Sequence, residues 1–205
     1  MASYASQVFL NVPFDRRYKK LRDALIFAVH DSGLTVRCAL ESDDGAEIRF
    51  TKLVRLIREC RLGIHDLSRT TLDGKHRLPR FNMPLELGLF LGAKLYGVDQ
   101  QPSKACLILE RDAHRYQVYC SDIAGQDIRG HGNDVQQAIA AVRNWLQANL
   151  ASSAKLAGPA KIRDRYLSFR QQLPYMCRVA DLRQSELTFL DYRNLVTAWI
   201  EENPR

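Results

Sequence analysis

Glu86 is the residue whose setting points most directly to chemistry. It lies in LELGLFLGAKLYG, an apolar run that is expected to form a helix with Pro84 in its first turn. A carboxylate at a helix N-terminus is most often a cap or a partner of the helix dipole. The same dipole, in a site shielded from water, would hold an ionised nucleophile or stabilise positive charge on a ribosyl carbon. The residue types alone leave both roles open.

The elements that would position Glu86 alternate between strand and helix. Apolar runs predict strands at 7–12, 34–40, 61–65 and 104–110. Helical periodicity falls between them, at about 21–29, 47–60 and 84–96, and again at 134–150. The segment 111–132 has no pattern that decides between strand and helix. The alternation predicts a mostly parallel sheet with helices on both faces.

Ligands of such sheets bind outside the carboxyl ends of the strands, so polar residues at those ends are candidates for a site. The candidate substrate-binding residues are Asn11, Asp15, Glu41, Asp44, Arg69, Arg80 and Asn82. Asp66, directly after the third strand, is the candidate second carboxylate beside Glu86. Its alternative role is a cap or turn residue, and we weigh the two equally.

Several of these residues have simpler explanations. Arg69 and Arg80 would clamp phosphates, although arginines in a polar loop are more often solvated. The acidic residues of 41–47 lack the spacing of a metal site, and Gly45 fits a turn, so no metal is expected. His65 ends a strand, where a histidine is more often structural than ligand-binding.

The run Asn82-Met-Pro-Leu-Glu86-Leu-Gly88, with the apolar helix and the strand ACLILE that follow, resembles the core of nucleoside 2-deoxyribosyltransferases. IRECRLGIHDLSR and VFLNVPFD are similar to other parts of that superfamily, whose relatives include bacterial TIR domains that cleave NAD. The resemblance covers roughly residues 7–112. It implies that Glu86 is a nucleophile that attacks an anomeric carbon, and that Asp66 helps to hold the base or the sugar.

Other common chemistries lack their motifs. The sequence contains no Gly-x-x-x-x-Gly-Lys loop, no Gly-x-Gly-x-x-Gly turn and no Gly-x-Ser-x-Gly elbow, which weakens ATPase, dehydrogenase and serine hydrolase functions. No cofactor is expected. The five cysteines are widely separated, so neither disulfides nor a zinc site are expected.

Charge and composition set the remaining expectations. The net charge of +7 attracts polyanions, and much of the excess lies after residue 155. Binding of nucleic acid through these residues is left open, although a solvated basic face is the favoured explanation of the charge. A homo-oligomer is left open as well. No signal-peptide pattern or membrane-spanning run is visible, which predicts a cytoplasmic protein without membrane association.

Together these observations predict a flavodoxin-like, three-layer α/β domain over 1–150 and a small helical appendage over 159–205, after a boundary in 151–158. We expect cleavage or transfer of an N-glycosidic bond in a nucleoside, a nucleotide or NAD. The alternative is a non-catalytic nucleotide sensor or adaptor. The resemblance to TIR domains further implies a role in bacterial defence.

Overall fold

The fold is built on one parallel sheet of five strands. The computed structural model describes residues 3–69, 72, 81–151 and 153–205. The strands are β1 (Gln7–Asn11), β2 (Thr35–Arg37), β3 (Leu62–Asp66), β4 (Ala105–Glu110) and β5 (Ile128–Gly130). Their order in the sheet is β2-β1-β3-β4-β5, with every neighbouring pair parallel. This is the flavodoxin-like order, and it confirms the expected fold class.

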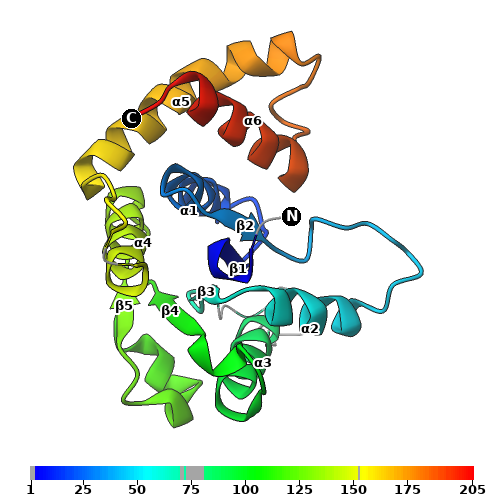
Figure 1. Ribbon diagram of the computed structural model, residues 1–205, viewed down its shortest axis with the longest axis vertical. Helices are drawn as coiled ribbons and strands as arrows, with labels where there is room; N and C mark the ends of the chain where they lie inside the picture. Colours follow the sequence, from blue (N-terminus) through cyan, green and yellow to red (C-terminus); the bar gives the residue numbers. More distant parts are fainter. Residues whose placement is uncertain (1–2, 70–71, 73–80, 152) are drawn as a thin grey trace.

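Helices cover both faces of the sheet (Figure 1). The described residues form α1 (Lys19–Asp31), α2 (Arg49–Glu59), α3 (Asn82–Tyr96), α4 (Val135–Asn149), α5 (Pro159–Val179) and α6 (Phe189–Glu202). One face carries α2 and α3, which pack on each other, and the other face carries α1 and α4. Short 3-10 turns precede β1 and β4 and occupy part of the connection between β4 and β5.

The strands alternate strictly between these two helical layers. In β1, Val8 and Leu10 belong to the core shared with α1 and α4, whereas Phe9 packs with α2 and α3. Both faces are buried, which is why β1 and β4 carry uninterrupted apolar runs, at 8–10 and 105–109. A residue's position in the strand therefore decides which layer it faces.

The C-terminal helices share the main core. Phe27 of α1 packs against Tyr166 and Phe169 of α5 and against Trp199 of α6, with ring centroids 5.4 to 5.7 Å apart. These rings belong to the same buried cluster as Val8 and other sheet residues. The helices thus form an outer layer over α1 and α4, seen above α1 in Figure 1.

Some boundaries differ from those expected from the sequence. The second strand is confined to Thr35–Arg37, because the chain turns at 39–41 towards the long connection before α2. The last helix begins at Phe189 and not near Ser185, since the Thr188 hydroxyl accepts from the Asp191 amide and the Asp191 carboxylate accepts in return. The expected helix at 134–150 is found within a residue at each end.

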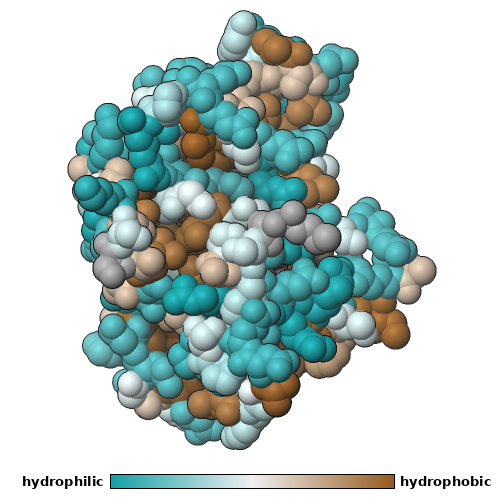
Figure 2. Space-filling model, in the orientation of Figure 1, coloured by the Kyte–Doolittle hydropathy of each residue, from teal (hydrophilic) through white to brown (hydrophobic). Residues whose placement is uncertain are grey.

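The outer surface is largely hydrophilic on the face shown in Figure 2, with hydrophobic residues gathered in patches at its edges. Ile48 and Phe50, at the start of α2, are among the large apolar side chains that remain exposed. Among the described residues, no helix combines the length and the apolar character needed to cross a bilayer.

A buried ion pair attaches α5 to α1. Arg165 Nε lies 2.8 Å from Asp31 Oδ1, its Nη2 donates to the Asn203 carbonyl, and its guanidinium lies 5.0 Å from the Trp199 ring centre. Asp31 is fully buried. Removing one partner of such a pair leaves an uncompensated charge in the core.

We therefore expect Arg165→Met to lower the free energy of unfolding by about 3–5 kcal/mol, measured by urea denaturation. The double variant Asp31→Asn/Arg165→Met should recover much of that loss. Arg163→Met is the control, because the Arg163 pair with Asp164 is partly exposed and worth at most about 1 kcal/mol. Equal effects of Arg163→Met and Arg165→Met would contradict the assignment.

Candidate functional site

The order of the strands across the sheet reverses between β1 and β3. The connection after β1 runs through α1 on one face of the sheet, and the connection that enters β3 runs through α2 on the other face. Ligands of open parallel sheets bind at such a point, where the chain direction across the sheet reverses. The N-termini of α2 and α3 lie at this same edge, because both helices run antiparallel to the strands.

The last residues of these two strands point to different layers. Asn11 pairs with His65 across the β1–β3 register, and both share the face of Phe9, towards α2 and α3. Asp66 is the next residue along β3, so its side chain lies on the opposite face, towards α1 and α4. The expected pairing of Asp66 and Glu86 in one cleft is therefore not found, since the sheet separates them.

Glu86 lies on the face of α3 that turns towards the sheet and α2. Its side chain is 5% exposed, and it belongs to the same side of the helix as Leu87 and Phe90. The helix begins at Asn82, two residues before Pro84, so Glu86 falls in the second turn and not in the first as expected. The helix dipole consequently supports its charge less than the sequence suggested.

The environment of Glu86 disfavours its charge. Burial raises the pKa of the Glu86 carboxyl to about 7, and the nearby charge of Arg49, the first residue of α2, offsets this only in part. Within the described residues, no hydrogen bond or ion pair reaches the Glu86 carboxylate. A carboxyl that titrates near neutral pH is suited to acid, base or nucleophilic chemistry.

Asn11 and His65 form the polar floor beneath this part of α3. Asn11 Nδ2 lies 2.9 Å from the Met83 carbonyl and 3.0 Å from His65 Nδ1, and so joins β1 to β3 and to the start of α3. Burial lowers the pKa of His65 to about 3, so its ring is neutral. Asn11 Oδ1 and His65 Nε2 are both buried and have no hydrogen-bond partner.

Gly63 allows this floor to pack closely. A Cβ atom on Gly63 would lie 2.7 Å from the Phe90 ring and 2.8 Å from His65 Nε2. The glycine therefore lets Phe90 and His65 settle onto the sheet, with their ring centroids 5.0 Å apart. This contact fixes the position of α3, and with it that of Glu86.

Asp66 is a fully satisfied, fully buried carboxylate. It accepts hydrogen bonds from the Tyr18 hydroxyl, from the Ser68 amide and hydroxyl, and from His131 Nε2 at 2.9 Å. Burial alone would raise the pKa of Asp66, but the bonds from His131, Ser68 and Tyr18 outweigh it and lower the pKa. These contacts tie β3 to the start of α1 and to the chain before α4, which is a structural role.

The Ser68, His131 and Asp66 side chains do not form a nucleophilic triad. His131 Nδ1 accepts a hydrogen bond from the Asn133 amide at 3.0 Å, which leaves the proton on Nε2, facing Asp66. Ser68 Oγ is 3.5 Å from the same Nε2 atom, which then has no lone pair to take the serine proton.

A second buried carboxylate, Glu110, is saturated in the same way. It accepts from the Arg111 amide, from the Arg115 guanidinium at 2.9 Å and from the Tyr119 hydroxyl. Arg115 also donates to the Ser68 carbonyl, and the Tyr119 oxygen lies 2.8 Å from the Leu67 carbonyl, so these residues join the ends of β3 and β4. The sequence pattern missed Glu110, Arg115, Tyr119 and His131, because 111–132 has no clear periodicity.

Other predicted site residues are held by local contacts. Asp15 accepts from the Arg17 and Tyr18 amides, and its second oxygen lies 3.2 Å from Arg69 Nε, so two of the candidates pair with each other. Glu41 turns back to Arg37, with both oxygens 2.8 Å from Nε.

The last three predicted residues have different settings. Asp44 accepts from the Ala46 amide in an exposed turn. Asn82 is exposed as the first residue of α3. Arg80 lies outside the described residues.

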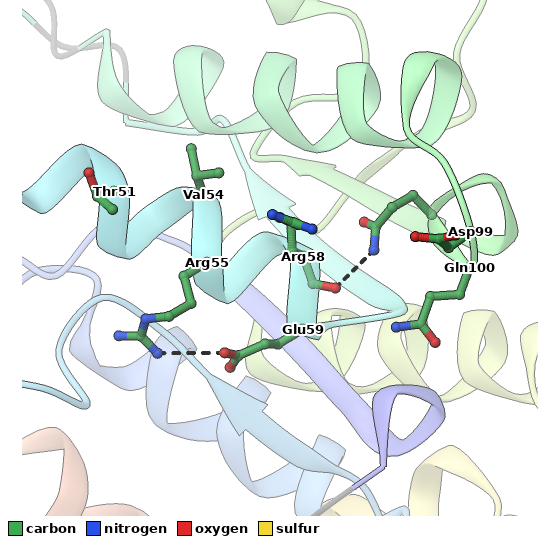
Figure 3. A pocket seen from close by; sticks show the side chains of 8 residues that line it. Thr51, Val54, Arg55, Arg58, Glu59, Asp99 and Gln100 are labelled. Atoms are coloured by element: carbon green, nitrogen blue, oxygen red, sulfur yellow. Dashed lines mark hydrogen bonds and ion pairs between the residues drawn. The ribbon is translucent and has the colours of Figure 1, made fainter.

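A separate cavity of about 540 Å³ lies at the opposite end of α2 and α3 (Figure 3). Arg55, which points to Glu59, and Gln101, whose amide donates to the Arg58 carbonyl at 3.0 Å, contribute to its wall. Its position at the amino edge of the sheet separates it from Glu86. Over the ranges that the structure describes, no group of three His, Cys, Asp or Glu side chains is placed to hold a metal ion.

The sequence matches no known family model, and no curated protein matches it.

The raised pKa of Glu86 has a consequence for stability. In the unfolded chain the pKa of this carboxyl is near its ordinary value of 4.5, whereas in the folded chain it is about 7. Ionisation therefore destabilises the fold progressively as the pH rises from about 4.5 to 7. Glu86→Gln, which stays neutral, should be more stable than wild type at pH 8, by up to about 3 kcal/mol, and similar to it at pH 4.5.

Thermal and urea unfolding at the two pH values would measure this difference. Glu59→Gln is the control, because that residue is partly exposed and pairs with Arg37 and Arg55. A Glu86→Gln variant that is less stable than wild type at pH 8 would show that the carboxylate has a stabilising partner.

Proposed function

We propose that this chain cleaves or transfers the N-glycosidic bond of a nucleoside, a nucleotide or NAD, with Glu86 as the nucleophile. The observation that carries the proposal is the state of Glu86. Asp31, Asp66 and Glu110 are the other buried acids of the described chain, and each is bound by an arginine or by several hydrogen-bond donors. Among the described residues Glu86 has no such partner, and it lies at the carboxyl edge of the sheet.

The reaction would proceed through a covalent intermediate. Ionised Glu86 attacks the anomeric carbon, the C–N bond breaks, and its electron pair leaves with the base. Nicotinamide leaves neutral, whereas a purine or pyrimidine base takes up a proton from solvent. Water or a second base then attacks the same carbon and releases the carboxylate. A carboxylate with a pKa near 7 is more basic, and hence a stronger nucleophile, than one with an ordinary pKa.

Neighbouring groups support a sugar in this position. Asn11 Oδ1 is buried without a partner, and it would accept a hydrogen bond from a ribose hydroxyl once the start of α3 moves aside. Arg49 is exposed at the start of α2 and would attract an anionic substrate. Asp66 acts only indirectly in this scheme, by holding the end of β3 through Tyr18 and His131.

A second candidate is a nucleotide sensor or adaptor without turnover. The saturation of Asp66 favours it, because the second carboxylate that the sequence suggested is not available to a substrate. Calorimetric titration with NAD and a panel of nucleosides and nucleotides would distinguish the two functions. Binding without release of a base would favour the sensor.

The enzymatic proposal predicts release of a free base from NAD or from one member of a nucleoside and nucleotide panel, followed by chromatography. The rate should rise with pH through about 7, since the ionised form of Glu86 attacks. Glu86→Gln should lower the rate by roughly a thousandfold or more, while Glu59→Gln leaves it unchanged. An unchanged rate in Glu86→Gln would exclude the nucleophile, and a rate that falls through pH 7 would indicate an acid.

A further inference from the structure

The outer face of α3 has the opposite character from that of an ordinary surface helix. A helix at the surface usually turns its apolar residues inwards and its charges outwards. The two charged residues of α3 are both turned inwards: Glu86 is buried, and Lys94 Nζ donates to the Lys104 carbonyl at 2.6 Å. The exposed residues of this helix are mostly apolar.

Five residues form a continuous stripe on this outer face, which we call the outer seam. It consists of Phe81, Leu85, Gly88, Gly92 and Leu95. The spacing alternates between four and three residues, which keeps one line along a helix facing a partner helix. Phe81, Leu85 and Leu95 are 64, 53 and 68% exposed, and the adjacent Tyr96 is 87% exposed.

Neither glycine is required by a close contact within the described residues, although Gly92 borders a hollow shared with Val54 and Arg58 of α2. A Cβ atom at Gly88 or at Gly92 would meet nothing within 4 Å. Glycine inside a helix costs about 1 kcal/mol relative to alanine, so two of them on one face require a reason. Small residues in the middle of a helix face let a second helix approach closely.

The seam is complementary to itself. A two-fold axis midway between Gly88 and Gly92 places each glycine against the other glycine of a second copy. The same axis places Leu85 of one copy against Leu95 of the other. An antiparallel pair of α3 helices would therefore cover the apolar side chains at both ends and bring the glycines together at the centre.

The charges at the helix ends fit the same arrangement. The N-terminus of α3 has no acidic residue in its first turn, and its N-cap residue Phe81 makes no side-chain capping bond. Asp99 lies just beyond the other end of the helix, with a φ of 58°. In an antiparallel pair, Asp99 of one copy lies beside the uncapped N-terminus of the other, where a carboxylate is stabilising.

From these observations we propose that the outer seam of α3 is the interface of a symmetric dimer of this chain. The exposed side chains of the seam, with Tyr96 and Val98, offer on the order of 500 Å² of apolar surface on each copy. This approaches the roughly 800 Å² per partner of a standard interface. Contacts at the rim of the interface, from α2, would supply the rest of the buried area.

Sedimentation equilibrium of the full chain tests this proposal. The wild type should be a dimer, and Leu95→Lys should weaken dimerisation at least tenfold. Gly88→Gln/Gly92→Gln should do the same by holding the helices apart, while the melting temperature of the monomer rises because glutamine favours the helix. Val179→Lys is the matched control, since Val179 is 70% exposed on α5, across the sheet from α3.

A wild-type chain that remains a monomer at all concentrations would overturn the proposal. A dimer that Leu95→Lys and the double glycine variant weaken no more than Val179→Lys would overturn it as well, because the interface would then lie elsewhere. The glycine variant also reports on folding, since its monomer should melt at a higher temperature.

Discussion

Buried carboxylates at the carboxyl edge of the sheet are the constraint on which the rest of this structure depends. Asp66 and Glu110 end adjacent strands and are both fully buried. An unpaired charge in that position would cost several kcal/mol, so each is surrounded by donors. Tyr18, at the start of α1, and His131, directly after β5, bind Asp66. Arg115 and Tyr119 bind Glu110. The loops at this edge are thereby fixed in place.

Glu86 differs from these two residues in a way that matters for function. The helix carries it to the same edge, but on the other face of the sheet from Asp66, where Arg49 is its only described compensating charge. The fold thus holds a carboxyl with a raised pKa at the carboxyl edge of the sheet, which is where parallel sheets bind ligands. A local cost in stability at one residue is expected where the residue serves chemistry.

The sequence predicted the sheet well and the site only in part. Apolar runs and helical periods are local properties, so β1 to β4 and most helices could be placed from them. β5 lies within 111–132, where no pattern decides between strand and helix. Two of the partners of Asp66, Tyr18 and His131, lie 48 and 65 residues away in the chain, and no local pattern predicts such contacts. Side chains alternate along β3, so His65 and Asp66 face opposite layers. This alternation could have predicted that Asp66 and Glu86 lie on different faces of the sheet. The pairing of Asp15 with Arg69, two residues selected separately, depends on the folded loops and is not visible in the sequence.

Glu86 is a buried carboxyl whose only opposing charge, among the described residues, is that of Arg49. Carbon-detected NMR titration of the Glu86 carboxyl in the wild-type protein, assigned by comparison with Glu86→Gln, measures this directly. We expect a pKa of about 7 for the Glu86 carboxyl. A value at or below the ordinary 4.5 would mean that donors stabilise the carboxylate, and Glu86 would then be a structural residue like Asp66 and Glu110.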